Sequence, residues 1–154
     1  MGTGGSKMRP FSAFRASIEP IQDEIAKAQG LAPSAMNEAG WTLLKGIFQT
    51  IRIMASGTSL VGNSKVMHHM LPNIVPPIDR EYTLRYVCGN TNIANDLDKE
   101  WQTMRDLIAG FFVPVATDVA FAAKARGWIS DAGAYPWDTS VMKVIDNLLI
   151  GSRK

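Results

Sequence analysis

The apolar residues of this chain recur every three or four positions, which is the spacing of one buried face of an α-helix. Sustained alternation of apolar and polar residues, the pattern of a half-buried strand, occurs nowhere in the sequence. The pattern therefore predicts an all-α fold. We expect a compact single domain over residues 8–154, built as a bundle of about six or seven helices.

The helices expected in the first half cover approximately residues 18–28, 37–55, 64–71 and 79–88. The first should end before Gly30 and the second at Gly57. Ser64 and Asp79 stand where the N-caps of the next two belong, because their short side chains accept hydrogen bonds from free backbone amides. Gly89 has the position of a C-terminal cap.

The second half carries the longest regular apolar stripe, over residues 93–111. We expect that helix to be interrupted near Pro114, since proline has no backbone N–H to donate. A further helix is predicted over 116–126. The last should open at the cap residues 138–140 and close at Gly151.

Between two predicted helices lies a segment rich in proline, residues 72–78. Pro72, Pro76 and Pro77 fix their own backbone angles and favour an extended backbone before them. We therefore expect a rigid connector that holds the end of one helix at a set distance from the start of the next.

Composition is that of a globular protein, with 46% hydrophobic and 19% charged residues among 154. Cys88 has no second cysteine to pair with, which suits a reducing compartment. The longest apolar run, 107–116, is too short to cross a bilayer, and no secretory signal is visible. We expect a cytoplasmic protein without a membrane segment. The glycine-rich residues 1–7 are expected to be a flexible tail or a remnant of an expression vector.

Charge is distributed unevenly along the chain. Residues 40–90 contain five basic and two acidic side chains, a local net charge of +3, whereas residues 91–146 carry five basic and eight acidic ones. A helix turn at 56–64 could offer backbone amides to a phosphate. The residues that would support nucleic-acid binding there are Arg52, Gly62, Lys65 and Arg80. Nucleic-acid binding is thus possible, although the basic strip is modest.

Ionisable residues cluster on both sides of the connector. Lys65 and His68 precede it, and a stiff connector could turn them toward Asp79. These three are the candidate catalytic residues. The alternative is structural: Asp79 caps a helix, and the charges are solvated. Adjacent histidines rarely share an ion, so we predict no metal site, and nothing in the sequence indicates a cofactor.

A second polar group occurs near the C-terminus. Asp146 and Asn147 sit between apolar pairs on the last predicted helix, and a buried carboxylate requires a partner. Lys143 is three residues away. We predict that Asp79 and Arg80 meet this group in one polar cluster.

Two segments, "SKVMHHMLPNIVPPIDREYT" (64–83) and "DTSVMKVIDNLLIG" (138–151), resemble a bacterial protein family that has no established activity. The resemblance implies that both segments belong to one functional or structural unit. The polar residues that it singles out are Lys65, His68, Asp79, Arg80, Tyr82, Lys143, Asp146 and Asn147.

A more distant likeness is to the helix-hairpin-helix DNA glycosylases, carried by "LVGNSK" (60–65) and "PPID" (76–79). The chain departs from that pattern: it lacks the first glycine of the hairpin, its lysine falls one position late, and the interval to the aspartate is shorter. The likeness implies a nucleic-acid-binding domain with glycosylase-type chemistry. Asp79 would then stabilise a cationic sugar while Lys65 or His68 moves a proton.

Three functions remain open from the sequence. No complete catalytic constellation is present, which favours a non-catalytic module that binds a protein partner or associates with itself. Nucleic-acid binding is the first alternative. The second is a small-molecule site at the loop 127–140, where a flat ligand could be framed by Trp128, Tyr135 and Trp137.

Overall fold

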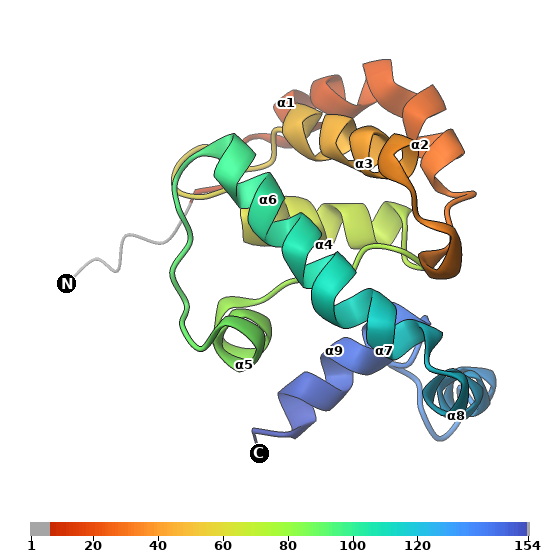
Figure 1. Ribbon diagram of the computed structural model, residues 1–154. Helices are drawn as coiled ribbons and strands as arrows, with labels where there is room; N and C mark the ends of the chain where they lie inside the picture. The colour runs from red at the N-terminus through yellow and green to blue at the C-terminus, as the bar shows by residue number, and fades with distance from the viewer. Residues whose placement is uncertain (1–6, 154) are drawn as a thin grey trace.

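The computed structural model describes residues 7–153 and confirms the all-α prediction. Its α-helices are α1 (Phe11–Ile18), α2 (Gln22–Ala28), α3 (Glu38–Thr50), α4 (Leu60–Met70), α5 (Arg85–Cys88), α6 (Leu97–Leu107), α7 (Val113–Thr117), α8 (Val119–Ser130) and α9 (Val141–Gly151) (Figure 1). Two π-helical segments, η3 (Arg80–Leu84) and η4 (Ile108–Phe112), precede α5 and α7. Short 3₁₀ turns form η1 (Glu19–Ile21) and η2 (Pro33–Ala35).

The N-terminal helices differ from the single helix predicted over 18–28. Pro20 lies in η1 and separates α1 from α2, because its ring and missing N–H cannot be accommodated inside a continuous helix. Lys7, which the predicted tail included, is hydrogen-bonded: its carbonyl accepts from the N–H of Ala55 at 2.7 Å. Residues 1–6 lie outside the described residues.

Helix α3 begins next to the predicted start at residue 37, where the Asn37 side chain caps it by accepting from the N–H of Gly40 at 2.9 Å. It ends at Thr50, earlier than predicted, since the following segment pairs with extended residues near the N-terminus instead. Arg9 donates its N–H to the carbonyl of Ile53 at 2.8 Å. A tertiary contact thus replaces the last turn that the apolar spacing had indicated.

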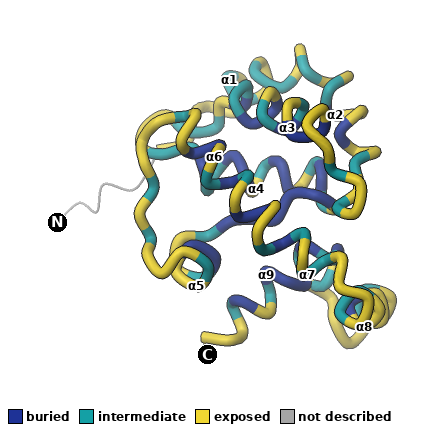
Figure 2. The backbone as a smooth tube through the Cα atoms, in the orientation of Figure 1, coloured by how far each residue is buried: buried dark blue, intermediate teal, exposed yellow. Residues whose placement is uncertain are grey.

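Helix α4 starts at Leu60 rather than at Ser64, so the prediction of Ser64 as an N-cap is wrong. Ser64 is buried inside the helix, and its Oγ donates to the carbonyl of Val61. The connector that follows is buried over residues 74–78 (Figure 2). Beyond it, Asp79 caps η3 as predicted, and Gly89 ends α5 with φ of 75°.

Helix α6 crosses the centre of the molecule and continues through η4 into α7 (Figure 1). The predicted interruption at Pro114 is wrong: the chain stays helical there, and Pro114 closely follows the π-helical segment η4, where the regular hydrogen-bond pattern of the α-helix is already shifted. The break comes later, at Asp118, whose side chain caps α8. The apolar side chains of α3, α4 and α6 form the main core, and α9 packs on Phe112 in a smaller second cluster.

Within residues 7–153, no single helix combines the length and the apolarity needed to cross a membrane. The segments Leu97–Thr117 and Val119–Ser130 have the required length and apolarity only when taken together, and the pair is bent by 81° at the break between them.

Candidate functional site

An open cleft of about 510 Å³ lies where α4, the connector with η3, and α9 with the loop before it come together. Its walls are formed by Lys65, His68, His69, Pro77, Asp79, Tyr82, Trp137, Thr139, Lys143, Asp146 and Ile150. The two segments 64–83 and 138–151 therefore face each other across one cleft. Both walls carry charged side chains and an aromatic ring, which is the composition of a site for a polar ligand.

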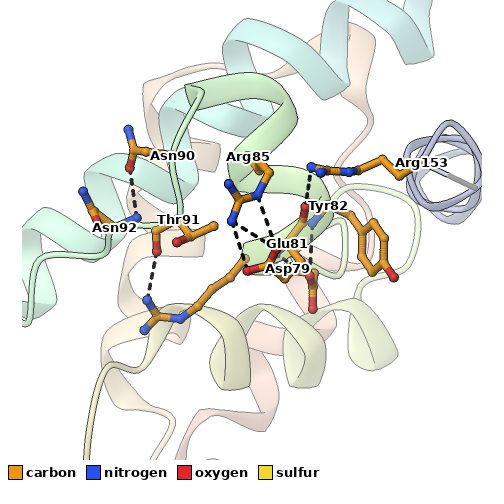
Figure 3. Close-up of polar contacts among 9 residues, drawn as sticks. Asp79, Glu81, Tyr82, Arg85, Asn90, Thr91, Asn92 and Arg153 are labelled. Atoms are coloured by element: carbon orange, nitrogen blue, oxygen red, sulfur yellow. Dashed lines mark hydrogen bonds and ion pairs between the residues drawn. The ribbon is translucent and has the colours of Figure 1, made fainter.

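Asp79 uses its two carboxylate oxygens differently. Oδ1 caps η3 by accepting from the N–H groups of Glu81 at 2.8 Å and Tyr82 at 3.2 Å (Figure 3). Oδ2 lies 3.9 Å from Nζ of Lys65 on α4. The side chain is directed toward the ribbon of α4 and away from Glu81 and Arg85, which pair with each other (Figure 3). One oxygen is therefore structural and the other is available in the cleft.

The connector is fastened to α4 by buried hydrogen bonds. Its prolines have no N–H, but Ile78 does, and that N–H donates to Oγ of Ser64 at 3.1 Å. The next amide, that of Asp79, donates to Oγ1 of Thr83 at 3.2 Å. These bonds fix the start of η3 against the helix that carries Lys65.

His68 makes a second bond between α4 and the connector. Its Nδ1 lies 2.7 Å from the carbonyl oxygen of Val75, so Nδ1 carries the proton in this bond. Burial lowers the pKa of His68, and the positive charge of Lys143 acts in the same direction, whereas the bond to Val75 and the charge of Asp146 oppose it. At neutral pH the ring is uncharged, and Nε2 is left as a hydrogen-bond acceptor.

The opposite wall contains an ion pair within α9. Nζ of Lys143 donates to Oδ2 of Asp146 at 2.6 Å. The Asp146 side chain is 4% exposed and that of Lys143 is 27% exposed, so this pair is far better shielded from solvent than the pair of Lys65 and Asp79. Shielding makes its geometry stiff.

Trp137 stands at the mouth of the cleft and is 76% exposed. Its backbone is held in place by α9, because Nδ2 of Asn147 donates to the Trp137 carbonyl at 3.1 Å. The same Nδ2 donates to Oδ1 of Asp138 at 2.7 Å. An exposed indole on a fixed loop is a suitable stacking surface for a flat ring.

The expected polar cluster forms only in part. Asp79, Tyr82, Lys143 and Asp146 line the cleft together. Arg80 leaves it: its guanidinium donates to the carbonyl of Thr91 at 2.9 Å and to Oγ1 of Thr58 at 2.8 Å. Asn147 also lies elsewhere, as a support for the loop that carries Trp137.

The three aromatic residues of the expected small-molecule loop separate. Trp137 lines the main cleft, whereas Trp128 and Tyr135 border a second, smaller cavity of about 200 Å³ next to Asn147. Trp128 and Tyr135 pack on each other with ring centroids 6.1 Å apart. The expected loop therefore does not act as one aromatic frame.

The backbone amides expected to bind a phosphate at 56–64 already have a partner. Oε2 of Glu100, on α6, accepts from the N–H groups of Ser59 and Leu60 at 2.6 Å each. Glu100 is 2% exposed, and burial raises its pKa, while the two amides act against that rise. The turn is thus capped from inside the protein, which corrects the idea of an open phosphate site.

The other nucleic-acid candidates do not form one face with this turn. A Cβ on Gly62 would lie 2.8 Å from Sδ of Met54, so this glycine permits close packing. Arg52 follows α3 and donates to the carbonyls of Gln49 and Ile51 at the end of that helix. Of the four candidates, Lys65 alone lines the cleft.

The cleft combines a carboxylate, an amine and a neutral imidazole beside two aromatic rings. Such groups can stabilise a developing cation and move protons. No cluster of three or more potential metal-ligating His, Cys, Asp or Glu side chains is found within residues 7–153.

Sequence reasoning missed Glu100. Its signal was present, because Glu100 falls on the apolar stripe of its helix, three residues after Leu97 and four before Met104. A carboxylate in that position has to find buried donors.

Comparison of the chain with protein-family models, with curated protein sequences and with solved structures found no match.

Proposed function

We propose that the cleft binds a nucleoside or nucleotide unit, free or within a strand, and hydrolyses its N-glycosidic bond. The observation that carries this proposal is the position of Lys65 and Asp79, which face each other 3.9 Å apart at the cleft. At this distance the two groups do not share a short hydrogen bond, so each can turn toward a ligand that approaches from the cleft.

The reaction assigns one role to each group. The bond between C1′ of the sugar and the base nitrogen breaks, its electron pair leaves with the base, and the Lys65 ammonium donates a proton to that base. Oδ2 of Asp79 stabilises the positive charge that develops on the sugar. A water molecule bonds to C1′ and gives its proton to Nε2 of His68. Solvent returns this proton to Lys65, so water is the one co-reactant.

The walls suit the size and chemistry of such a unit. A volume of about 510 Å³ lies within the range of small-ligand sites. Trp137 and Tyr82 offer aromatic faces for a base, and stacking on aromatic side chains is tolerant of base identity. His69 lines the same space and can donate a hydrogen bond to a phosphate group.

The test is release of free base, measured by chromatography after incubation with ribonucleosides, nucleotides, and oligonucleotides containing uracil, hypoxanthine or methylated purines. Separate arms for free nucleotides and for strands identify the source of the substrate. Asp79→Asn should lower release by at least about 100-fold. The matched control is Asp98→Asn, because Asp98 pairs with Lys45 at 3.1 Å on an exposed surface away from the cleft. No release from any substrate would sink the proposal.

A protein-interaction role stays a prediction, favoured by one surface feature. Tyr86 and Leu148 are exposed apolar side chains that border a groove of about 250 Å³ together with Phe111. Exposed apolar patches of this kind occur at association surfaces. Self-association would appear in sedimentation velocity as a weight-average mass that rises with protein concentration. A constant monomer mass over the concentration range would contradict it.

A further inference from the structure

The inner wall of the cleft contains a buried acceptor that the protein does not fully use. Asp146 is 3% exposed, and its Oδ2 is bound to Lys143 at 2.6 Å. Oδ1 of Asp146 has no hydrogen-bond donor among residues 7–153. This oxygen is not completely buried either. Within residues 7–153, the side-chain atom that is both fully buried and without a hydrogen-bond partner is Oδ1 of Asn63, not Oδ1 of Asp146. Since Asp146 lines the cleft, its Oδ1 is open to that space.

The pair offers a ligand two complementary atoms side by side. Oδ1 of Asp146 accepts hydrogen bonds, and the remaining protons on Nζ of Lys143 can be donated. Both residues are on α9, and their mutual bond fixes the acceptor next to the donor. Asp146 is only 3% exposed, so a ligand that supplies an N–H to this oxygen competes with little water and gains more than it would at the surface.

The stacking surface belongs to the same framework. Asn147, also on α9, holds the backbone carbonyl of Trp137 at 3.1 Å. Helix α9 therefore carries Lys143 and Asp146 and also holds the backbone of Trp137. A flat ring that stacks on the Trp137 indole could present its edge to Lys143 and Asp146. The face of the ring would contact Trp137 on the loop, and its edge would contact the two residues on α9.

We propose that Lys143 and Asp146 select the base by its hydrogen-bonding edge and that the preferred base is guanine. This inference rests on the proposed function and names the substrate class of the same site. Guanine presents two adjacent N–H donors, on N1 and N2, beside the acceptor O6. Both donors can share Oδ1 of Asp146, because a carboxylate oxygen has two lone pairs, and O6 matches Nζ of Lys143.

Other bases match less well. Hypoxanthine keeps the N1–H donor and O6 but lacks the amino group on C2, so it loses one bond. Adenine reverses the order, because it has a donor at position 6 and a lone pair at N1. With the sugar held in one position, that lone pair would face the carboxylate of Asp146 and leave it unpaired. Affinity should therefore fall from guanine to hypoxanthine to adenine.

The experiment is isothermal titration of the whole chain with the carbocyclic analogues of guanosine, inosine and adenosine. These lack the sugar ring oxygen, so no bond is cleaved during the titration. The wild-type protein should bind the guanosine analogue about 10-fold more tightly than the adenosine analogue, with inosine between them. Asp146→Asn should remove this preference or reverse it, because an amide can pair with adenine. Lys143→Met should weaken the guanosine and inosine analogues and spare adenosine.

The outcomes separate the two proposals. Equal binding of the three analogues by the wild-type protein overturns the selection of guanine without requiring any variant, and the proposed hydrolysis stands if base is still released. The selection of guanine by Asp146 is also overturned if Asp146→Asn keeps its helical circular dichroism and its preference for guanosine. If no analogue binds and no base is released from any nucleotide, both proposals fail. Asp98→Asn, the same change in a surface ion pair, should leave all three affinities as they are.

Discussion

Nζ of Lys65 lies 3.9 Å from Oδ2 of Asp79, beyond the length of a hydrogen bond. Lys65 is 51% exposed and Asp79 34% exposed, so the attraction between them contributes little to the stability of the fold. The two charges are held near each other by the backbone. The N–H of Ile78, the residue before Asp79, donates to Oγ of Ser64, the residue before Lys65, so the charged pair can open for a ligand without loss of the fold.

Replacement of Asp79 can separate its structural role from its chemical one. Asp79→Asn retains an oxygen that can cap η3 but loses the negative charge. We expect base release to fall by at least about 100-fold, while the free energy of unfolding changes by less than about 1 kcal/mol. Asp79→Ala loses the cap as well and should cost about 1 kcal/mol more in urea unfolding. Equal activity of the wild type and Asp79→Asn would show that Asp79 is a cap and nothing more.

Replacement of Trp137 should weaken ligand binding and leave the stability of the fold nearly unchanged. Because the indole is 76% exposed, Trp137→Ala should change the free energy of unfolding by no more than about 0.5 kcal/mol. Loss of a stacking surface should nevertheless weaken nucleoside binding by about 10-fold, measured by calorimetric titration. Trp128→Ala is a suitable control, since Trp128 borders the other cavity. A nucleoside affinity unchanged by Trp137→Ala would exclude stacking on this residue.

Local sequence signals predicted most of the helices and several of their caps. Asp79 accepts from free backbone amides at the start of η3, and Gly89 ends α5 with a positive φ that its missing Cβ permits. The errors arose where distant segments decide the structure. Ser64 has a side chain suited to an N-cap, but Glu100 from α6 caps α4 one turn earlier and places Ser64 inside the helix. No local pattern contains that contact.

The cleft was foreseen in outline for the same reason. Lys65 and Asp79 are joined by a short stiff connector, so their proximity followed from sequence spacing. Arg80 and Asn147 could not be placed in this way, because their side-chain directions depend on the partners Thr91 and Trp137.

Ser64 is predicted to be a stability residue. Its Oγ accepts from the buried N–H of Ile78 at 3.1 Å, and Ser64→Ala would leave that amide without a partner. The free energy of unfolding should fall by about 1–3 kcal/mol, measured by urea denaturation. Ser59→Ala tests the specificity of this effect, because the Ser59 side chain makes no cap bond to α4. Similar stabilities for Ser64→Ala and the wild type would mean that the Ile78 amide finds another acceptor.

The buried ring of His68 predicts a pH dependence of stability. Burial lowers the pKa of His68 in the folded state, whereas the unfolded chain titrates near the ordinary value of 6.5. Below pH 6.5 the unfolded state therefore binds more protons than the folded state. The free energy of unfolding should fall as the pH decreases from 6.5 through the lowered pKa, and this contribution should be fully present above 6.5.

His68→Asn provides the comparison, because the amide can still donate to Val75 but does not titrate. Urea denaturation from pH 5 to pH 8 should show a smaller decrease toward low pH in this variant than in the wild type. Parallel curves for the two proteins would assign the pH dependence to other groups.

Glu100 should be the most sensitive buried polar residue for folding. Glu100→Ala removes the acceptor of two N–H groups, those of Ser59 and Leu60, from a position that is 2% exposed. Each unpaired amide costs about 1–3 kcal/mol, so the free energy of unfolding should fall by roughly 2–6 kcal/mol.

Glu100→Gln separates the acceptor from the charge. The glutamine carbonyl can still accept from both amides. The uncharged side chain also avoids the cost of burying a charge, which is the effect that raises the pKa of Glu100. We expect Glu100→Gln to lower the free energy of unfolding by less than Glu100→Ala does. This decrease should be smaller at pH 8 than at pH 5. The reason is that the protonated carboxyl is favoured in the folded state. Its contribution to stability is complete below the pKa of the unfolded chain and is lost as the pH rises through the raised pKa of the folded state. Urea denaturation at both pH values measures the difference. If Glu100→Gln were as unstable as Glu100→Ala at either pH, the negative charge itself, acting on the N-terminus of α4, would be what holds the helix that carries Lys65 in place.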